Sequence, residues 1–253
     1  MRNSTTSCTC NDNAAGLILT SHADGRSSWA FTSFLIGSSA NGIGRGGFAQ
    51  RDFSRGDLII AEPPLAHFIV PDRKLISGIE LADILEKTIE SLNDAQRTAY
   101  FALAQLPDGG IAGLPNSMEA AHGIWMTNAY PTTSGRDEGG DGQAVFEQIC
   151  RLNHSCSPRC AVVDCADGLV RVVTTRPIRK GEEVCFCYSS SALFQPRAQR
   201  RATLQRMWSF SCECERCTGQ IHRDEQRAWR LLVVQRARLC ASARWPHGCT
   251  ARC

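Results

Sequence analysis

Short apolar runs alternate with turn residues over much of the chain. Between Trp29 and Leu65 these runs are separated by the polar stretches SSANGIGRGG and FSRGD, which predicts consecutive strands. The pattern returns after residue 160, where CAVVD, LVRVVTT and EVCFCY are short, rich in β-branched residues and separated by Asp-Gly and Lys-Gly turns. We therefore expect a small, folded-over β architecture.

A different pattern lies between residues 79 and 106. Apolar residues recur there at helical spacing, at Leu81, Ile84, Leu85, Ile89 and Leu92. Asn93 or Asp94 can cap a second helix, which carries Tyr100, Phe101 and Leu103. These residues predict a helical insert between strand regions.

Two further helices are expected in the C-terminal part of the chain. PRAQRRATLQRMW, from 196 to 208, predicts a helix with its arginines facing water, namely Arg197, Arg200, Arg201 and Arg206. Residues 222 to 240 form another helical stretch. We expect a disordered tail at 1–28, a main domain at 29–190 with the helical insert at about 75–125, a helix and cysteine-rich segment at 191–217, and a helix and tail at 218–253.

Composition and charge exclude some classes of protein. The net charge of +3 is small and no block of like charges occurs, so tight nucleic-acid binding is not expected. The apolar stretch Trp29 to Gly37 is too short to span a bilayer and lacks the flanks of a signal peptide. We expect an intracellular protein, in the nucleus, the cytoplasm or both, that does not bind membranes.

Cysteines are the most informative residues in the composition. Fourteen cysteines in a reducing compartment more often hold metal than form disulfides. Cys212, Cys214 and Cys217 lie within six residues, close enough to converge on one tetrahedral ion. Structural zinc needs a fourth ligand, which is either the nearby His222 or a residue from a distant loop.

Two other motifs suggest chemistry. GIGRGGF, at 42–48, contains the glycine spacing of a dinucleotide-binding loop, but a strand follows it where that site requires a helix. NHSC, at 153–156, has the residue types of a nucleophile and its base, but no nucleophile elbow or known triad signature surrounds it. Neither motif alone defines a function.

Taken in order, the motifs resemble those of SET-domain protein-lysine methyltransferases, in particular the SET and MYND family and its fungal-type relatives. The resemblance covers roughly residues 42 to 217. It rests on Gly44-Arg45-Gly46 with Phe48-Ala49, on Asn153 to Pro158, on the Gly181 to Tyr188 strand and on the Phe210 to Cys217 tail. It implies a mainly β (α+β) SET fold with a helical insert and a zinc-binding post-SET tail followed by a C-terminal helix.

The resemblance also implies an activity. Relatives transfer a methyl group from S-adenosyl-L-methionine to a lysine side chain of a histone or non-histone protein, and we expect a monomer. The alternative is an inactive SET-like module that binds cofactor or peptide as a scaffold. The insert from 65 to 130 contains no cysteine, so no MYND zinc module is expected.

Roles for individual residues follow from the same resemblance. Tyr188 would be catalytic and would also touch the cofactor, and Phe186 would line the lysine channel. The remaining cofactor-binding residues would be Ile43, Gly44, Arg45, Asn128, Asn153, His154 and Phe210. Zinc would be held by Cys156, Cys212, Cys214 and Cys217.

Two positions depart from the family pattern. Arg159 stands where Asn is usual, and Cys187 stands where many members have Asp. We expect neither to remove a chemical group, although Arg159 changes the loop that follows NHSC.

Overall fold

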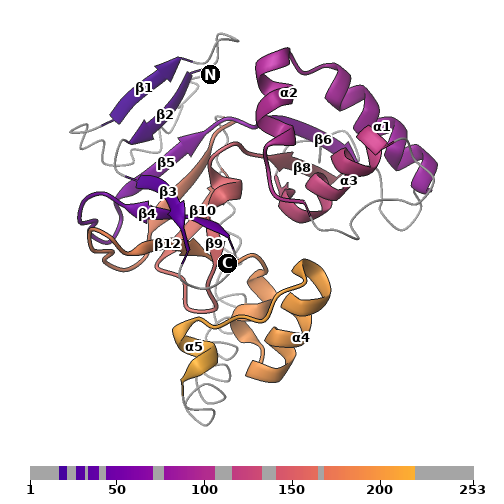
Figure 1. Cartoon of the computed structure of the whole chain (residues 1–253). Coiled ribbons are helices and arrows are strands. Elements are labelled where there is room, and N and C mark those ends of the chain that lie inside the picture. Colours follow the sequence, from indigo (N-terminus) through magenta and orange to yellow (C-terminus); the bar gives the residue numbers. More distant parts are fainter. Residues whose placement is uncertain are drawn as a thin grey trace, which may run out of the picture.

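The computed structural model describes residues 17–21, 27–31, 34–39, 44–70, 77–105, 116–132, 141–164 and 168–219. Three small β-sheets form the body of the molecule, a helical part lies beside one of them, and a second helical part lies below (Figure 1). The predicted α+β class, mainly β with a helical insert, is confirmed.

The first sheet has five antiparallel strands in the order β1-β2-β5-β11-β10. Its strands are β1 Leu17–Ser21, β2 Ser27–Phe31, β5 Leu58–Glu62, β10 Cys160–Asp164 and β11 Val170–Thr174. The residues of β5, β10 and β11 that face the core are β-branched or small, which suits a pleated, half-buried surface.

The second sheet has the order β3-β4-β12-β9. Its strands are β3 Phe34–Ser38, β4 Arg45–Ala49, β9 Asn153–His154 and β12 Glu183–Phe186. The β9–β12 pair is parallel and sets Asn153 opposite Cys185 and His154 opposite Phe186. The NHSC segment is therefore held directly against the strand that leads to Tyr188.

The third sheet carries the helical insert. Its strands, in the order β6-β8-β7, are β6 Ala66–Val70, β8 Asp141–Val145 and β7 Tyr130–Pro131. The insert helices are α1 Gly78–Glu90, α2 Asp94–Phe101 and α3 Asn116–Asn128. Leu85, Tyr100 and Trp125 are buried with Phe68 in a core separate from that of the other two sheets.

Capping explains where the first two insert helices begin. Ser77 and Glu80 form a reciprocal capping box at the start of α1, and Asn93 and Gln96 form another at the start of α2. The two helices predicted between 79 and 106 are thus confirmed, with Asn93 as the cap of the second.

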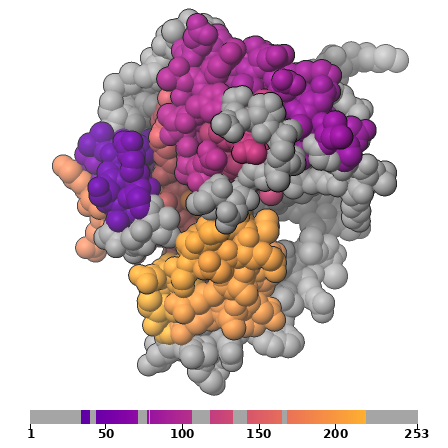
Figure 2. All heavy atoms as spheres, turned by 45° about the vertical axis from the view of Figure 1, so that its right-hand side comes forward, coloured from indigo at the N-terminus to yellow at the C-terminus, as the bar shows by residue number. Residues whose placement is uncertain are grey.

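The remaining helices follow the last strand. They are the 3₁₀ helix η3 Ser190–Phe194, α4 Arg197–Trp208 and α5 Glu215–Thr218; an earlier 3₁₀ helix, η2 Ile149–Arg151, directly precedes β9. Figure 2 shows α4 and α5 as a block below the insert helices. Among the described residues, none of the helices combines the length and apolar character needed to cross a bilayer.

Two expectations are corrected. The predicted tail at 1–28 contains β1, because Leu17, Ile18 and Leu19 lie in a strand that pairs with β2. Arg200, expected to face water, is fully buried beside the cysteines of the tail. The predicted helix at 222–240 and tail to 253 lie outside the described residues, as do His222 and Ile43.

A buried carboxyl group holds the segment that leads into β9. Glu62, at the end of β5, accepts hydrogen bonds of 2.7 to 3.2 Å from the backbone N–H groups of Glu147, Gln148 and Ile149. Burial raises the pKa of Glu62 to about 7, against the opposite effect of these donors. Glu62 thus fixes the start of η2 and, through it, the approach to Asn153.

We predict that Glu62→Gln changes the pH dependence of stability. The folded chain holds the Glu62 proton more tightly than the unfolded chain, so the carboxyl stabilises the fold below pH 4.5 and loses that contribution as the pH rises through about 7. Over that range the free energy of unfolding of the wild type should fall by roughly 3 kcal/mol relative to the variant. Denaturant titrations at a series of pH values measure this difference.

Glu80→Gln is the matched control. The Ser77 backbone N–H lowers the pKa of this exposed carboxyl, so its contribution is lost as the pH falls and has the opposite sign. A wild-type minus Glu62→Gln difference that is flat between pH 4.5 and 7 would contradict the assignment.

Candidate functional site

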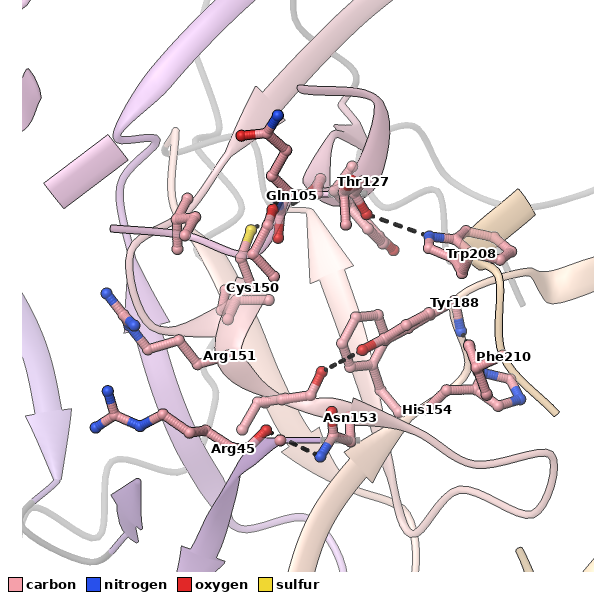
Figure 3. A pocket seen from close by; sticks show the side chains of 18 of the residues that line it. Arg45, Gln105, Thr127, Cys150, Arg151, Asn153, His154, Tyr188, Trp208 and Phe210 are labelled. Carbon is pink, nitrogen blue, oxygen red and sulfur yellow. Dashed lines mark hydrogen bonds between the residues drawn. The ribbon is translucent and has the colours of Figure 1, made fainter. Parts of the chain in front are cut away.

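One cavity of about 470 Å³ lies where β4, β9, the end of β12, the end of α3 and the cysteine-rich segment meet (Figure 3). Its volume is in the range of small-molecule sites. Its lining contains every described residue that the sequence predicts for cofactor or lysine binding, namely Gly44, Arg45, Asn128, Asn153, His154, Phe186, Tyr188 and Phe210. These residues are spread along the described chain from Gly44 to Phe210.

Asn153 is held by its neighbours on the sheet. Its Nδ2 donates to the Arg45 carbonyl at 3.1 Å and to Glu183 Oε1 at 2.7 Å, and the other oxygen of Glu183 accepts from Ser39 Oγ at 3.1 Å. A Cβ on Gly46 would lie 2.7 Å from Asn153 Nδ2 and even nearer to Glu183 Oε1. A side chain at 46 would displace both groups, so glycine at 46 leaves room for Asn153 to bond the backbone of β4 and the Glu183 carboxylate.

His154 is buried and both its ring nitrogens have partners. Nδ1 accepts from the Tyr188 backbone N–H at 3.1 Å, and Nε2 lies 3.2 Å from Cys156 Sγ. Burial lowers the pKa of His154 to about 4, so the ring is neutral near pH 7. With the ring nitrogens engaged inside the protein, the backbone and the ring face are left for a ligand.

Tyr188 projects into the cavity just after β12. Its hydroxyl donates to the Leu152 carbonyl at 3.0 Å, and burial raises its pKa above the ordinary value, so it stays protonated. Because the phenol proton is used by Leu152, the oxygen lone pairs remain able to accept a hydrogen bond from a ligand.

Aromatic rings surround Tyr188. Phe186, Trp208 and Phe210 have ring centroids 5.1, 5.4 and 6.4 Å from that of Tyr188. Ser209, at the end of α4, has φ 55°, and this left-handed residue reverses the chain between Trp208 and Phe210. The reversal lets two successive aromatic residues of the tail meet one tyrosine.

Asn128 ends α3 at the cavity wall. Its Nδ2 donates to the carbonyls of Ala104 and Ile124, each at 2.7 Å, so the amide is fixed by the insert. The backbone carbonyl of Asn128 accepts a hydrogen bond from the Cys150 thiol at 3.5 Å. Asn128 therefore connects the helical insert to the η2 side of the cavity.

Four cysteines gather beside the cavity. The sulfur atoms of Cys156, Cys212, Cys214 and Cys217 all lie within 4.8 Å of one another, with Cys156 Sγ 3.9 Å from Cys212 Sγ and 3.6 Å from Cys217 Sγ. A tetrahedral ion with bonds of about 2.3 Å to sulfur requires sulfur atoms ~3.8 Å apart. The four side chains thus fit a structural zinc ion.

The protonation of these thiols is perturbed by their proximity. Contact with neighbouring thiols, that of Cys156 foremost, lowers the pKa of Cys217 to about 6 and holds that of Cys214 well below its ordinary value. Thiolates are the form that binds metal. The cluster therefore favours the ligand form at two of its four positions.

Two buried arginines adjoin the cysteine cluster. Arg200 Nη2 lies 3.6 Å from Cys217 Sγ, and its Nη1 donates to the Gln195 carbonyl at 2.8 Å. Arg216 Nη1 donates to the carbonyls of Cys156 and Leu193. A guanidinium group beside thiolates lowers the free-energy cost of burying either kind of charge. This explains why Arg200 faces inward.

The two residues that depart from the family pattern, Arg159 and Cys187, form hydrogen bonds with nearby groups. Arg159 Nη1 donates to Glu182 Oε2 at 3.0 Å and to the Pro177 carbonyl at 3.1 Å, so it links the loop after NHSC to the turn before β12. The Cys187 thiol donates to the Ser189 carbonyl at 3.0 Å. Neither side chain lines the cavity.

Sequence reasoning missed several lining residues, including Thr127, Tyr130, Cys150, Arg151 and Trp208. Trp208 Nε1 donates to the Thr127 carbonyl at 3.2 Å and so joins α4 to α3 across the cavity. The signal for Trp208 was an aromatic residue two positions before Phe210. Thr127 and Cys150 carry no such signal, because only the fold brings them to the cavity.

The chain is similar in sequence to a known family and to known proteins. The SET domain family profile matches residues 44–189, more than half of the chain. The Schizosaccharomyces pombe "SET domain and MYND-type zinc finger protein 6" is 40% identical over 77 residues, 30% of this chain and 15% of the relative. The Saccharomyces cerevisiae "Potential protein lysine methyltransferase SET6" is 35% identical over 80 residues, 32% of this chain and 21% of the relative.

A human relative gives a similar match. "Histone-lysine N-methyltransferase SMYD3" is 34% identical over 79 residues, 31% of this chain and 18% of the relative. Across these three relatives the alignments span between 15% and 21% of the relative's length.

We predict that the purified protein contains one zinc ion per chain and that Cys156→Ser reduces the bound zinc. Loss of one of four thiolates leaves an incomplete tetrahedral site with weaker affinity. Elemental analysis after dialysis against a weak chelator measures the difference.

Cys160→Ser is the matched control. Cys160 is also a buried thiol, but it donates to the Cys185 carbonyl and is outside the cysteine cluster. Zinc content should be unchanged in this variant. Full zinc content in Cys156→Ser would instead indicate another fourth ligand, such as His222.

Proposed function

The chain belongs to the SET-domain family, and we propose that it is a protein-lysine N-methyltransferase that uses S-adenosyl-L-methionine. The observation that carries the proposal is the cavity of about 470 Å³ in which the described cofactor-site residues, Phe186 and Tyr188 all meet. The substrate would be a lysine side chain of a histone or non-histone protein.

The cofactor site would be built around β4 and β9. Asn153 and the Gly44–Arg45 backbone would hold the polar groups of S-adenosyl-L-methionine, and the Phe210 ring would stack on its adenine. Arg45 and Arg151 extend their guanidinium groups on the side away from Tyr188 (Figure 3), where they suit the carboxylate of the methionine end. Bound there, the cofactor supplies a methyl group on a positively charged sulfur.

The lysine would enter among aromatic rings. A lysine with a pKa of about 10.4 must lose its proton to act as a nucleophile, which costs roughly 4 to 5 kcal/mol at pH 7. The rings of Phe186, Tyr188 and Trp208 provide an apolar wall that favours the neutral amine by desolvation. The apolar wall would therefore favour the neutral amine without a dedicated strong base.

Tyr188 would orient the amine. Its hydroxyl proton is held by the Leu152 carbonyl, so a lone pair on its oxygen can accept an amine N–H. This contact points the nitrogen lone pair along one direction, and correct alignment lowers the barrier by proximity. The role is positional, since the raised pKa of Tyr188 keeps it neutral.

Zinc would serve the fold of the site. Bound to Cys156, Cys212, Cys214 and Cys217, it would tie the tail that carries Trp208 and Phe210 to the NHSC loop. We further propose that the protein acts as a monomer in the nucleus, the cytoplasm or both.

A catalytically inactive scaffold is the alternative. Retention of Asn153, His154, Tyr188 and the four cysteines in one site favours the enzyme. Incubation with labelled S-adenosyl-L-methionine and a protein extract discriminates the two, because the enzyme transfers label to protein. Cofactor binding without any transfer would support the scaffold.

We predict that Tyr188→Phe loses most of the methyl transfer, by about 100-fold or more, while the cofactor dissociation constant changes by less than about threefold. The hydroxyl is lost but the ring contacts remain. Single-turnover transfer and calorimetric titration measure the two quantities.

Tyr100→Phe is the control for hydroxyl loss. Its hydroxyl donates to the Ala121 carbonyl in the insert core and does not line the cavity, so stability should fall while transfer per folded molecule is retained. Unchanged turnover in Tyr188→Phe would show that the catalytic tyrosine lies elsewhere.

We predict that Phe186→Tyr shifts the product towards monomethyl-lysine. The ring centroids of Phe186 and Tyr188 are 5.1 Å apart. A hydroxyl added to Phe186 would narrow the space for a methylated amine and offer the amine a further hydrogen bond. Mass spectrometry of a methylated substrate peptide gives the product ratio. The same ratio in both proteins would place Phe186 outside the lysine channel.

A further inference from the structure

The His154 ring connects the cysteine cluster to the backbone of Tyr188. It is 8% exposed, with one nitrogen 3.2 Å from Cys156 Sγ and the other 3.1 Å from the Tyr188 backbone nitrogen. A single rigid imidazole therefore touches both a cluster cysteine and the residue that carries the phenol. No intervening side chain or flexible segment is needed.

The hydrogen-bond directions of this bridge are fixed by chemistry. The Tyr188 backbone N–H can only donate, so Nδ1 must be the acceptor and the ring proton must lie on Nε2. Nε2–H then points at Cys156 Sγ, which is a strong acceptor when it is the thiolate of a metal ligand. The ring is held from both ends, with a donor towards sulfur and an acceptor towards Tyr188.

The surroundings leave the ring little freedom. Its centroid lies 5.3 Å from the Tyr188 ring and 5.9 Å from the Phe210 ring, so it is confined between two residues of the cavity wall. Cys156 is itself 1% exposed and touches Cys212 and Cys217. A displacement of the Cys156 sulfur must therefore be passed to the imidazole.

We propose that His154 is a positioning residue that couples metal binding by the four-cysteine cluster to the placement of Tyr188. The proposal rests on the proposed function of Tyr188 in lysine methylation. The metal would then determine the geometry of the lysine site as well as the fold of the tail. His154 would act on the metal ligand Cys156 and not on the methyl group.

Fluorine NMR tests the coupling in the wild-type protein. The chain has three tyrosines, Tyr100, Tyr130 and Tyr188, so fluorotyrosine labelling gives three resonances that Tyr→Phe variants assign. Exchange of zinc for cadmium keeps four thiolate ligands but lengthens the metal–sulfur bonds. We expect the Tyr188 resonance to move and that of Tyr100, in the insert core, to stay. A Tyr188 resonance that does not respond would overturn the proposal.

The variant His154→Asn separates coupling from simple packing. Its amide can still accept from the Tyr188 N–H but is too short to donate to Cys156. Zinc affinity, measured by chelator competition, should fall about 10- to 100-fold, the usual effect of losing a partner of a metal ligand. The Tyr188 resonance should no longer move on cadmium exchange.

Two further variants complete the test. His67→Asn is the matched control, because this histidine lies on β6, away from the cysteine cluster, and its Nε2 bonds the Thr132 hydroxyl. It should leave zinc affinity and the Tyr188 response unchanged. If His154→Asn does not fold, His154→Gln keeps a donor that reaches Cys156, so its zinc affinity should stay within about threefold while the Tyr188 response is lost. Unchanged zinc affinity in His154→Asn, or a cadmium response equal to that of the wild type, would refute the coupling.

None of these readouts requires cofactor or substrate. A protein that shows the coupling but transfers no methyl group would contradict the proposed function and support the coupling through His154. A protein that methylates lysine without any response of Tyr188 to the metal would support the proposed function and contradict the coupling.

Discussion

The parallel pairing of β9 with β12 is the constraint on which the site depends. Two residues of β9 face Cys185 and Phe186, and the alternation of side chains along a strand sends Asn153 and His154 to different sides. Asn153 meets Glu183 and the backbone of β4, whereas His154 meets Tyr188 and Cys156. A shift of one residue in this short register would exchange the two sides and separate the cavity from the cysteine cluster.

Charge balance is the second organising feature. The cysteine cluster gathers four sulfur atoms in a buried place, and thiolates there require nearby positive charge. Arg200 and Arg216 provide it from α4 and α5, and their carbonyl partners at Leu193, Gln195 and Cys156 fix both guanidinium groups. The tail therefore combines a small cluster, made of cysteines and Leu204, with two buried guanidinium groups, whereas the larger cores of the sheets and the insert are apolar.

Local sequence was informative where one short segment determines the outcome. The strands of β10 to β12, the capping of α2 by Asn93 and the closeness of Cys212, Cys214 and Cys217 could all be predicted from neighbouring residues. Features that depend on distant partners could not. Arg200 looks like any surface arginine of a polar helix until the thiolates are placed beside it, and Leu17 to Leu19 form a run too short to reveal a strand without β2. His154 was expected to bind the cofactor, and only the fold shows that both of its ring nitrogens already have partners inside the protein.

The long separation between the parts of the cavity has a consequence for synthesis of the chain. Its walls run from Gly44 to Cys214, and Cys156 meets a partner 61 residues further on. Chains emerge from the ribosome at about 5 to 20 residues per second, so the last strand, β12, precedes Trp208 and Phe210 by about 1 to 4 seconds. During that interval Phe186 and Tyr188 face water and the Cys156 thiol lacks its neighbours. The nascent protein thus passes through a stage in which the residues of the proposed lysine site and the Cys156 thiol are open to solvent and oxidants before the tail covers them.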